Sequence, residues 1–93
     1  MDIYAQIAEK IIREQEAIIG PVALEQAQKV PGLTVDAQVH EISFNGDKKE
    51  IIEQLVRKYE ALFGRTSIEV CKEAVRDILP KASKDQLPQL LLH

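Results

Sequence analysis

The clearest structural signal in this chain is an apolar stripe at helical spacing between Asp47 and Gly64. Its members recur every three or four positions: Ile51, Ile52, Leu55, Val56, Tyr59, Leu62 and Phe63. This spacing places them along one side of a helix, which must be buried against other elements. Asp47 and Glu50 resemble a capping box, and Gly64 supplies a C-terminal stop. The pattern therefore predicts a helix over residues 48–63.

Helical spacing of apolar residues also marks other parts of the chain. Three further segments are predicted to be helices: residues 2–19, 21–29 and 67–79. Gly20 and Pro21 separate the first two, because glycine suits a helix C-cap and proline suits the first turn of a new helix. Thr66 and Glu69 repeat the capping-box pattern before the last segment.

Residues 33–46 lose the helical spacing and favour extended structure. Within them, residues 39–44 alternate with a period of two, and Asn45 and Gly46 form a turn signal. Because a lone strand leaves its backbone groups unpaired, this strand needs a partner. It pairs either with residues 33–35 in a hairpin or across a dimer, and the sequence leaves both open.

A chain of 93 residues is long enough for one hydrophobic core, so we expect a single domain over residues 1–93. The predicted class is mainly α, a small bundle of four to five helices with a short strand or hairpin around residues 33–46. Residues 81–93 are expected to form a C-terminal tail or a short helix.

Charge and composition disfavour several classes of partner. The net charge is -3, so the composition does not indicate a basic surface that would bind a polyanion. There are only four aromatic residues, too few for a platform on which nucleic-acid bases would stack. No unbroken apolar run is longer than Leu90–Leu92, which is far shorter than the roughly 20 residues that span a bilayer. A single cysteine and no signal-peptide pattern favour a cytoplasmic protein. We therefore expect no nucleic acid and no membrane as partners.

The chain carries no constellation typical of catalysis, a cofactor or a metal. Cys71 falls on the apolar face of a predicted helix, where a cysteine behaves as a small inert hydrophobe. His40 is the only internal histidine, whereas a zinc site needs three or four ligands. No glycine lies in a phosphate-binding loop motif. We expect a protein that is not an enzyme and that holds neither a metal nor a cofactor.

The strongest functional signal is a surplus of apolar residues. Leucines crowd the C-terminal end, and apolar residues occur on more than one side of the first predicted helix. Gln15 interrupts that helix's stripe; it either fixes the register of an apolar seam or rotates to solvent. The predicted interface consists of Ile11, Gln15, Ile18, Leu87, Leu90 and Leu91. The alternative is that the tail folds back and closes the core of its own chain.

These features predict a protein–protein interaction or oligomerisation module, whose partner is a second copy in a homodimer or another protein. The first alternative is a small-ligand sensor with a pocket between the first helix and residues 33–46. The second is a helix-turn-helix protein built from residues 48–63 and 67–79, although Glu69 and Glu73 would face the DNA backbone unfavourably.

The string from Ile18 to Ala23, with its Gly20-Pro21 pair, resembles the corner in small helical modules attached to bacterial signalling proteins such as kinases and response regulators. The resemblance covers six residues, and this chain differs in its predicted strand and in that no catalytic domain is expected within its 93 residues. It implies a role in protein contacts within bacterial signalling or regulation, and it implies no catalytic residue.

Overall fold

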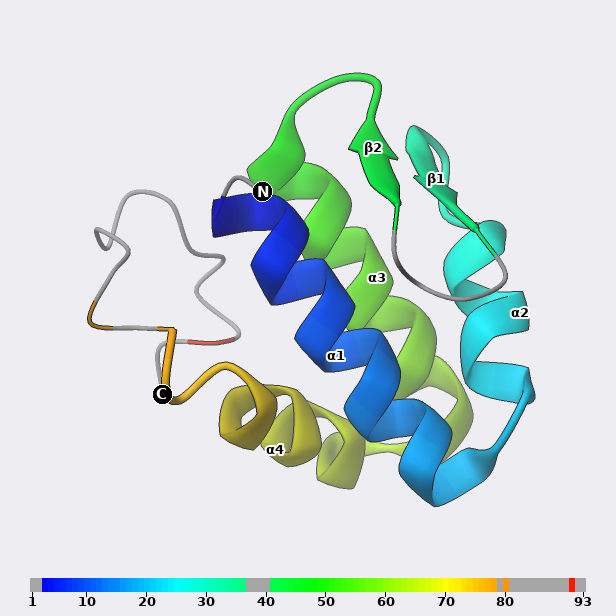
Figure 1. Ribbon diagram of the computed structural model, residues 1–93. Helices are drawn as coiled ribbons and strands as arrows, with labels where there is room; N and C mark the ends of the chain where they lie inside the picture. The colour runs from blue at the N-terminus through cyan, green and yellow to red at the C-terminus, as the bar shows by residue number, and fades with distance from the viewer. Residues whose placement is uncertain (1–2, 37–40, 79, 81–90, 92–93) are drawn as a thin grey trace.

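The computed structural model describes residues 3–36, 41–78, 80 and 91 (Figure 1). Within these ranges the chain forms four helices and a two-stranded antiparallel hairpin. The elements in chain order are α1 (Ile3–Ile19), α2 (Val22–Gln28), β1 (Leu33–Val35), β2 (Ile42–Phe44), α3 (Lys48–Phe63) and α4 (Arg65–Ala74). The predicted mainly α class with a short hairpin is confirmed.

α3 occupies the residues that its apolar stripe predicts. The Asp47 side chain accepts a hydrogen bond from the Glu50 backbone N–H at 3.2 Å, so half of the predicted capping box forms. α1 and α2 also follow the prediction closely. α2 is one residue shorter than predicted at each end, and residue 2, the predicted start of α1, lies outside the described residues.

α4 departs from the prediction at both ends. It starts at Arg65, and no side chain caps it, so the predicted cap at Thr66 is wrong. The reason is that Gly64 serves two helices: its N–H donates to the Glu60 carbonyl at 2.8 Å, and its carbonyl accepts from the Ser67 N–H at 3.1 Å. Regular helix ends at Ala74 and gives way to turns, whereas the prediction continued to residue 79, which lies outside the described residues.

The hairpin forms within one chain, which decides between the two pairings that the sequence left open. Leu33 pairs with Phe44, Thr34 with Ser43, and Val35 with Ile42. The second strand begins at residue 42 rather than at residue 39, and residues 39–40 lie outside the described part. Leu33 and Val35 are buried, so the hairpin adds its inner face to the core.

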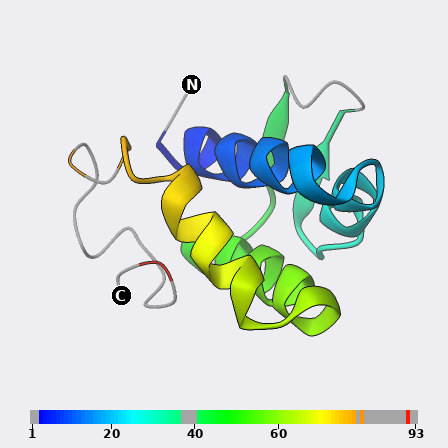
Figure 2. The same cartoon turned by 90° about the horizontal axis from the view of Figure 1, so that it is seen from below.

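α1 is the central helix of the fold. Figure 1 shows α1 and α3 running side by side in the same direction, with α2 and the hairpin beyond one side of the pair. α4 crosses near the other side, as the view from below shows (Figure 2). α1 packs against α2, α3 and α4, so its side chains are covered on more than one side. This explains why a single helix carries apolar residues over so much of its circumference.

Candidate interaction surface

The structure separates the predicted interface residues into different environments. Ile11 and Leu91 are 0% and 2% exposed and belong to the hydrophobic core. They are therefore covered by their own chain and offer no apolar surface to a partner, which corrects the prediction for these two positions. Ile18 is 61% exposed, while Leu87 and Leu90 lie outside the described residues. The burial of Leu91 agrees with the alternative in which the tail closes its own core.

Gln15 is buried, so the interpretation that its side chain rotates to solvent is wrong. Its Nε2 donates to the Ser67 carbonyl at 3.2 Å and to the Cys71 Sγ at 3.6 Å. Both acceptors belong to α4, so the amide joins α1 to α4 inside one chain. A buried amide of this kind favours the one register in which its donors are satisfied.

Cys71 packs in the core, as the sequence predicts. Burial raises the pKa of its thiol from the usual 9.0 to about 11, and the hydrogen bond from Gln15 partly opposes that rise. The thiol is thus protonated at neutral pH and a poor nucleophile. Among the described residues, no group of three or more histidine, cysteine or acidic side chains is placed to hold a metal ion.

Exposed apolar side chains gather instead at one end of the helices. Four large ones are exposed among the described residues: Ile18 (61%), Val22 (37%), Leu62 (49%) and Phe63 (44%). They come from the last turn of α1, the first residue of α2 and the last turn of α3. We refer to these four residues as the end patch.

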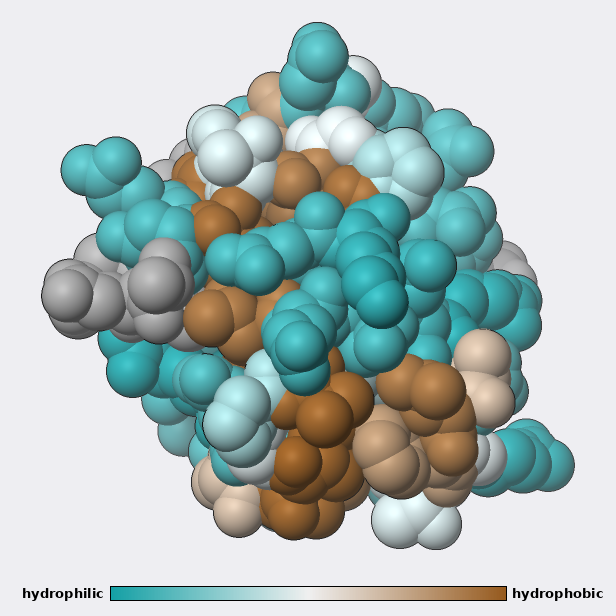
Figure 3. All heavy atoms as spheres, turned by 90° about the vertical axis from the view of Figure 1, so that its right-hand side faces the viewer, coloured by the Kyte–Doolittle hydropathy of each residue, from teal (hydrophilic) through white to brown (hydrophobic). Residues whose placement is uncertain are grey.

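One buried hydrogen bond fixes the helix ends that build the end patch. The Tyr59 hydroxyl donates to the Ala23 carbonyl at 2.7 Å and so holds α3 against the start of α2. Val22 directly precedes Ala23, and Leu62 lies one turn beyond Tyr59. Figure 3 views the molecule from the right-hand side of Figure 1, and it shows apolar groups on the lower part, where the corner between α1 and α2 lies, and further apolar groups in the upper half.

The sequence alone assigned Leu62 and Phe63 to the buried stripe of α3. The stripe continues for one turn beyond Tyr59, whereas α2 begins beside Tyr59, where the Tyr59 hydroxyl binds the Ala23 carbonyl. The sequence contains no signal for this position of α2, because it depends on a contact between residues far apart in the chain.

A cavity of about 350 Å³ opens elsewhere on the molecule. Its lining comes from the turn before β1, the turn after β2 and the first half of α3: Pro31, Asn45, Gly46, Asp47, Glu50, Ile51 and Gln54. None of these residues belongs to α1, whereas the small-ligand alternative placed its pocket against that helix. The Asp47 carboxylate in this lining already caps α3.

No described helix combines the length and the apolar character needed to cross a membrane. Comparison of the chain with models of protein families, with curated proteins and with solved structures finds no match.

Proposed function

We propose that this chain is a non-enzymatic protein-interaction module that docks through the end patch. The observation that carries the proposal is the exposure of four large apolar side chains on adjoining helix ends. Full burial of one such side chain is worth about 1.5 to 3 kcal/mol, so covering the exposed halves of four gives about 3 to 6 kcal/mol before the cost of association. A group of exposed apolar side chains on neighbouring helix ends marks an interaction site more often than scattered exposed residues do.

Two further features support this assignment. The thiol of Cys71, the only cysteine, is buried and protonated at neutral pH, so it gives no support to nucleophilic catalysis. The Gly20-Pro21 corner that resembles bacterial signalling modules lies between Ile18 and Val22, inside the end patch. We propose bacterial signalling or regulation as the setting on the basis of that resemblance.

Site-specific photo-crosslinking in cells tests the proposal. A photoreactive benzoylphenylalanine replaces Leu62 in the full chain, and a matched control carries it at Arg76, whose side chain is 72% exposed on the turn after α4. A docking surface at the end patch predicts an adduct from position 62 and none from position 76. The mass of the adduct distinguishes a second copy from a different protein.

A second variant tests whether the adduct depends on the patch. Adding Ile18→Glu to the Leu62 probe chain is expected to abolish the adduct and to leave the far-ultraviolet circular dichroism spectrum unchanged, because Ile18 is exposed. No adduct at position 62, or equal adducts at positions 62 and 76, would contradict the proposed function.

A further inference from the structure

We propose that the occupant of the end patch is a second copy of this chain, related to the first by a two-fold axis through the patch. This inference rests on the proposed docking function and names its partner. In such a symmetric dimer both copies use the same surface, so the apolar side chains of the patch face their own counterparts.

The size of the end patch fits a small, reversible dimer. Four side chains exposed by 37% to 61% present roughly 200 to 400 Å² of apolar surface on each copy. Because apolar atoms make up about 57% to 65% of an interface, two copies would bury roughly 600 to 1,400 Å² in all. That range lies at the low end of protein interfaces, where association is weak and depends on concentration.

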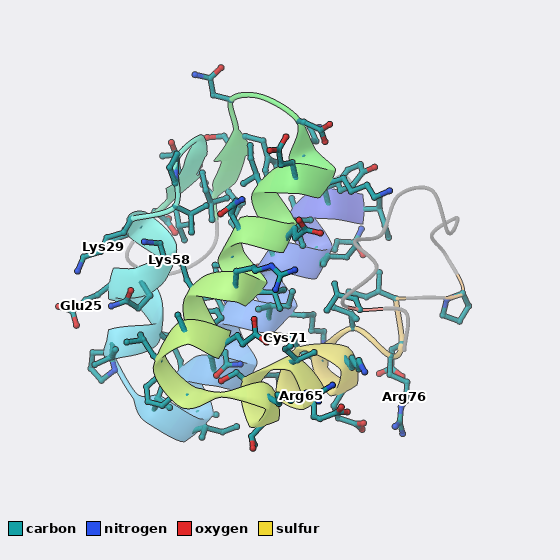
Figure 4. The ribbon with its side chains drawn as sticks, turned by 180° about the vertical axis from the view of Figure 1, so that it is seen from behind. Glu25, Lys29, Lys58, Arg65, Cys71 and Arg76 are labelled. Atoms are coloured by element: carbon teal, nitrogen blue, oxygen red, sulfur yellow. The ribbon has the colours of Figure 1, made fainter. Side chains whose placement is uncertain are left out.

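Two exposed charges beside the patch are of opposite sign and lie on opposite sides of it, while the exposed Glu14, one turn before Ile18 on α1, adds a further acidic charge. Glu25 lies on α2 one turn after Val22, and Arg65 begins α4 two positions after Phe63. Both are exposed, and neither takes part in the ion pairs found within the described residues. Figure 4 shows Glu25 on the outer side of α2 and Arg65 across the end of α3 from it.

This arrangement of charge complements itself under a two-fold rotation. The rotation brings Glu25 of each copy toward Arg65 of the other, which forms the same ion pair twice. A rim of one sign would instead favour a different protein of opposite charge. Lys29 and Lys58 lie beyond Glu25, farther from the Gly20-Pro21 corner (Figure 4), so Glu25 is nearer the patch than either lysine.

Sedimentation velocity of the full chain from about 10 μM to 1 mM tests the inference. The wild-type chain is expected to shift from monomer toward dimer within this range. Glu25→Arg and Arg65→Glu are each expected to weaken the dimer about 5- to 10-fold at low salt, because each leaves two like-charged contacts. The double variant restores both pairs and should return within about twofold of wild type.

The control is Arg76→Glu, which makes the same charge change away from the patch and is expected to leave the dimer unchanged. A wild-type chain that remains monomeric at 1 mM overturns the second copy as occupant. An adduct from position 62 with a different protein would then still support the docking function, so the two failures are distinguishable. Association that survives Ile18→Glu, or that the double charge reversal does not restore, also overturns the two-fold arrangement.

Discussion

The hydroxyl of Tyr59 and the carbonyl of Ala23, 36 positions apart in the chain, are joined by a buried hydrogen bond of 2.7 Å. Both residues are 0% exposed. Burial raises the pKa of Tyr59 well above its usual 10.0, and the nearby Cys71 and Glu16 raise it further. The hydroxyl therefore remains a donor throughout the physiological pH range, and it holds α2 against α3 where the end patch begins.

Replacing Tyr59 with phenylalanine removes this donor and keeps the buried ring. We expect the free energy of unfolding to fall by about 1 to 2 kcal/mol, as when one buried hydrogen bond is lost. Denaturation by urea at pH 7 measures the change. Tyr4→Phe is the matched control, because Tyr4 is only half-buried; an equal loss in both variants would contradict the role assigned to the Tyr59 bond.

Gln15→Leu tests the amide that joins α1 to α4. The variant keeps an apolar side chain of similar size but removes the donor to the Ser67 carbonyl and the Cys71 Sγ. We expect a loss of about 1 to 2 kcal/mol in the free energy of unfolding. Amide hydrogen exchange should accelerate in α4 more than in α2 or α3, and uniform acceleration would argue against a register role.

Ser67→Ala is expected to act in the opposite direction. The Ser67 hydroxyl is buried and has no hydrogen-bond partner among the described residues. Removing a buried polar group without a partner recovers its desolvation cost, so we expect the free energy of unfolding to stay level or rise by about 1 kcal/mol. Thermal and urea denaturation measure it, and a loss above about 1 kcal/mol would show that the hydroxyl has a partner.

The sequence predicted those elements whose boundaries depend on local chemistry. The Asp47 cap, the Gly64 stop and the stripe between them are contained in one segment, and α3 follows them at both ends. α4 was harder to predict, because Gly64 ends one helix and begins the next. The backbone hydrogen bonds of Gly64, rather than a side-chain cap, accompany a helix that starts before Thr66.

The candidate site was less accessible to sequence reasoning, because periodicity shows that a side chain is apolar but does not show what covers it. The sequence placed Ile11 in an interface, yet α1 packs against three helices and Ile11 is buried. Phe63 looked buried, yet it lies beyond the point where α2 begins beside Tyr59 and is 44% exposed. Both errors concern the number and position of neighbouring elements, which depend on contacts between distant parts of the chain.

Gly32 is the position where we expect the smallest substitution to have the largest effect. Its φ of +84° disfavours any other residue, and an added Cβ would lie 2.7 Å from the Asn45 carbonyl oxygen and 3.0 Å from the Ile51 Cδ1. Gly32→Ala should therefore lower the free energy of unfolding by about 3 kcal/mol or more, since backbone strain and a steric clash add. Urea denaturation at pH 7 measures the loss.

Gly20→Ala provides the matched control for that loss. Gly20 has a similar φ of +74°, but nothing lies within 4 Å of its added Cβ. Only the backbone strain remains, which corresponds to about 1 to 2 kcal/mol. Equal losses in the two variants would show that the close approach of Asn45 to Gly32 does not contribute.

Because the Cys71 thiol is buried, we expect the protein to lose stability at alkaline pH. Its thiol ionises near 9.0 in the unfolded chain and near 11 in the folded chain, because burial disfavours the thiolate. Between pH 9 and pH 11 the unfolded chain binds fewer protons than the folded chain. The contribution of the Cys71 thiol to the free energy of unfolding is therefore complete below pH 9 and is lost as the pH rises toward 11. Two pKa units correspond to about 2 to 3 kcal/mol.

Urea denaturation at pH 7, 8, 9 and 10 compares the wild-type chain with Cys71→Ala. The variant starts from a lower free energy of unfolding because a buried side chain becomes smaller, but its decline above pH 8 should be shallower, by about 1 kcal/mol per pH unit at most. Cys71 also raises the pKa of Tyr59, but burial is the largest cause of that rise and is present in both chains. The remaining titrating groups are common to both chains and cancel in the difference between the two curves. Parallel curves between pH 8 and pH 10 would show that the Cys71 thiol ionises equally readily in the folded and unfolded chains, which would contradict its burial between α1 and α4.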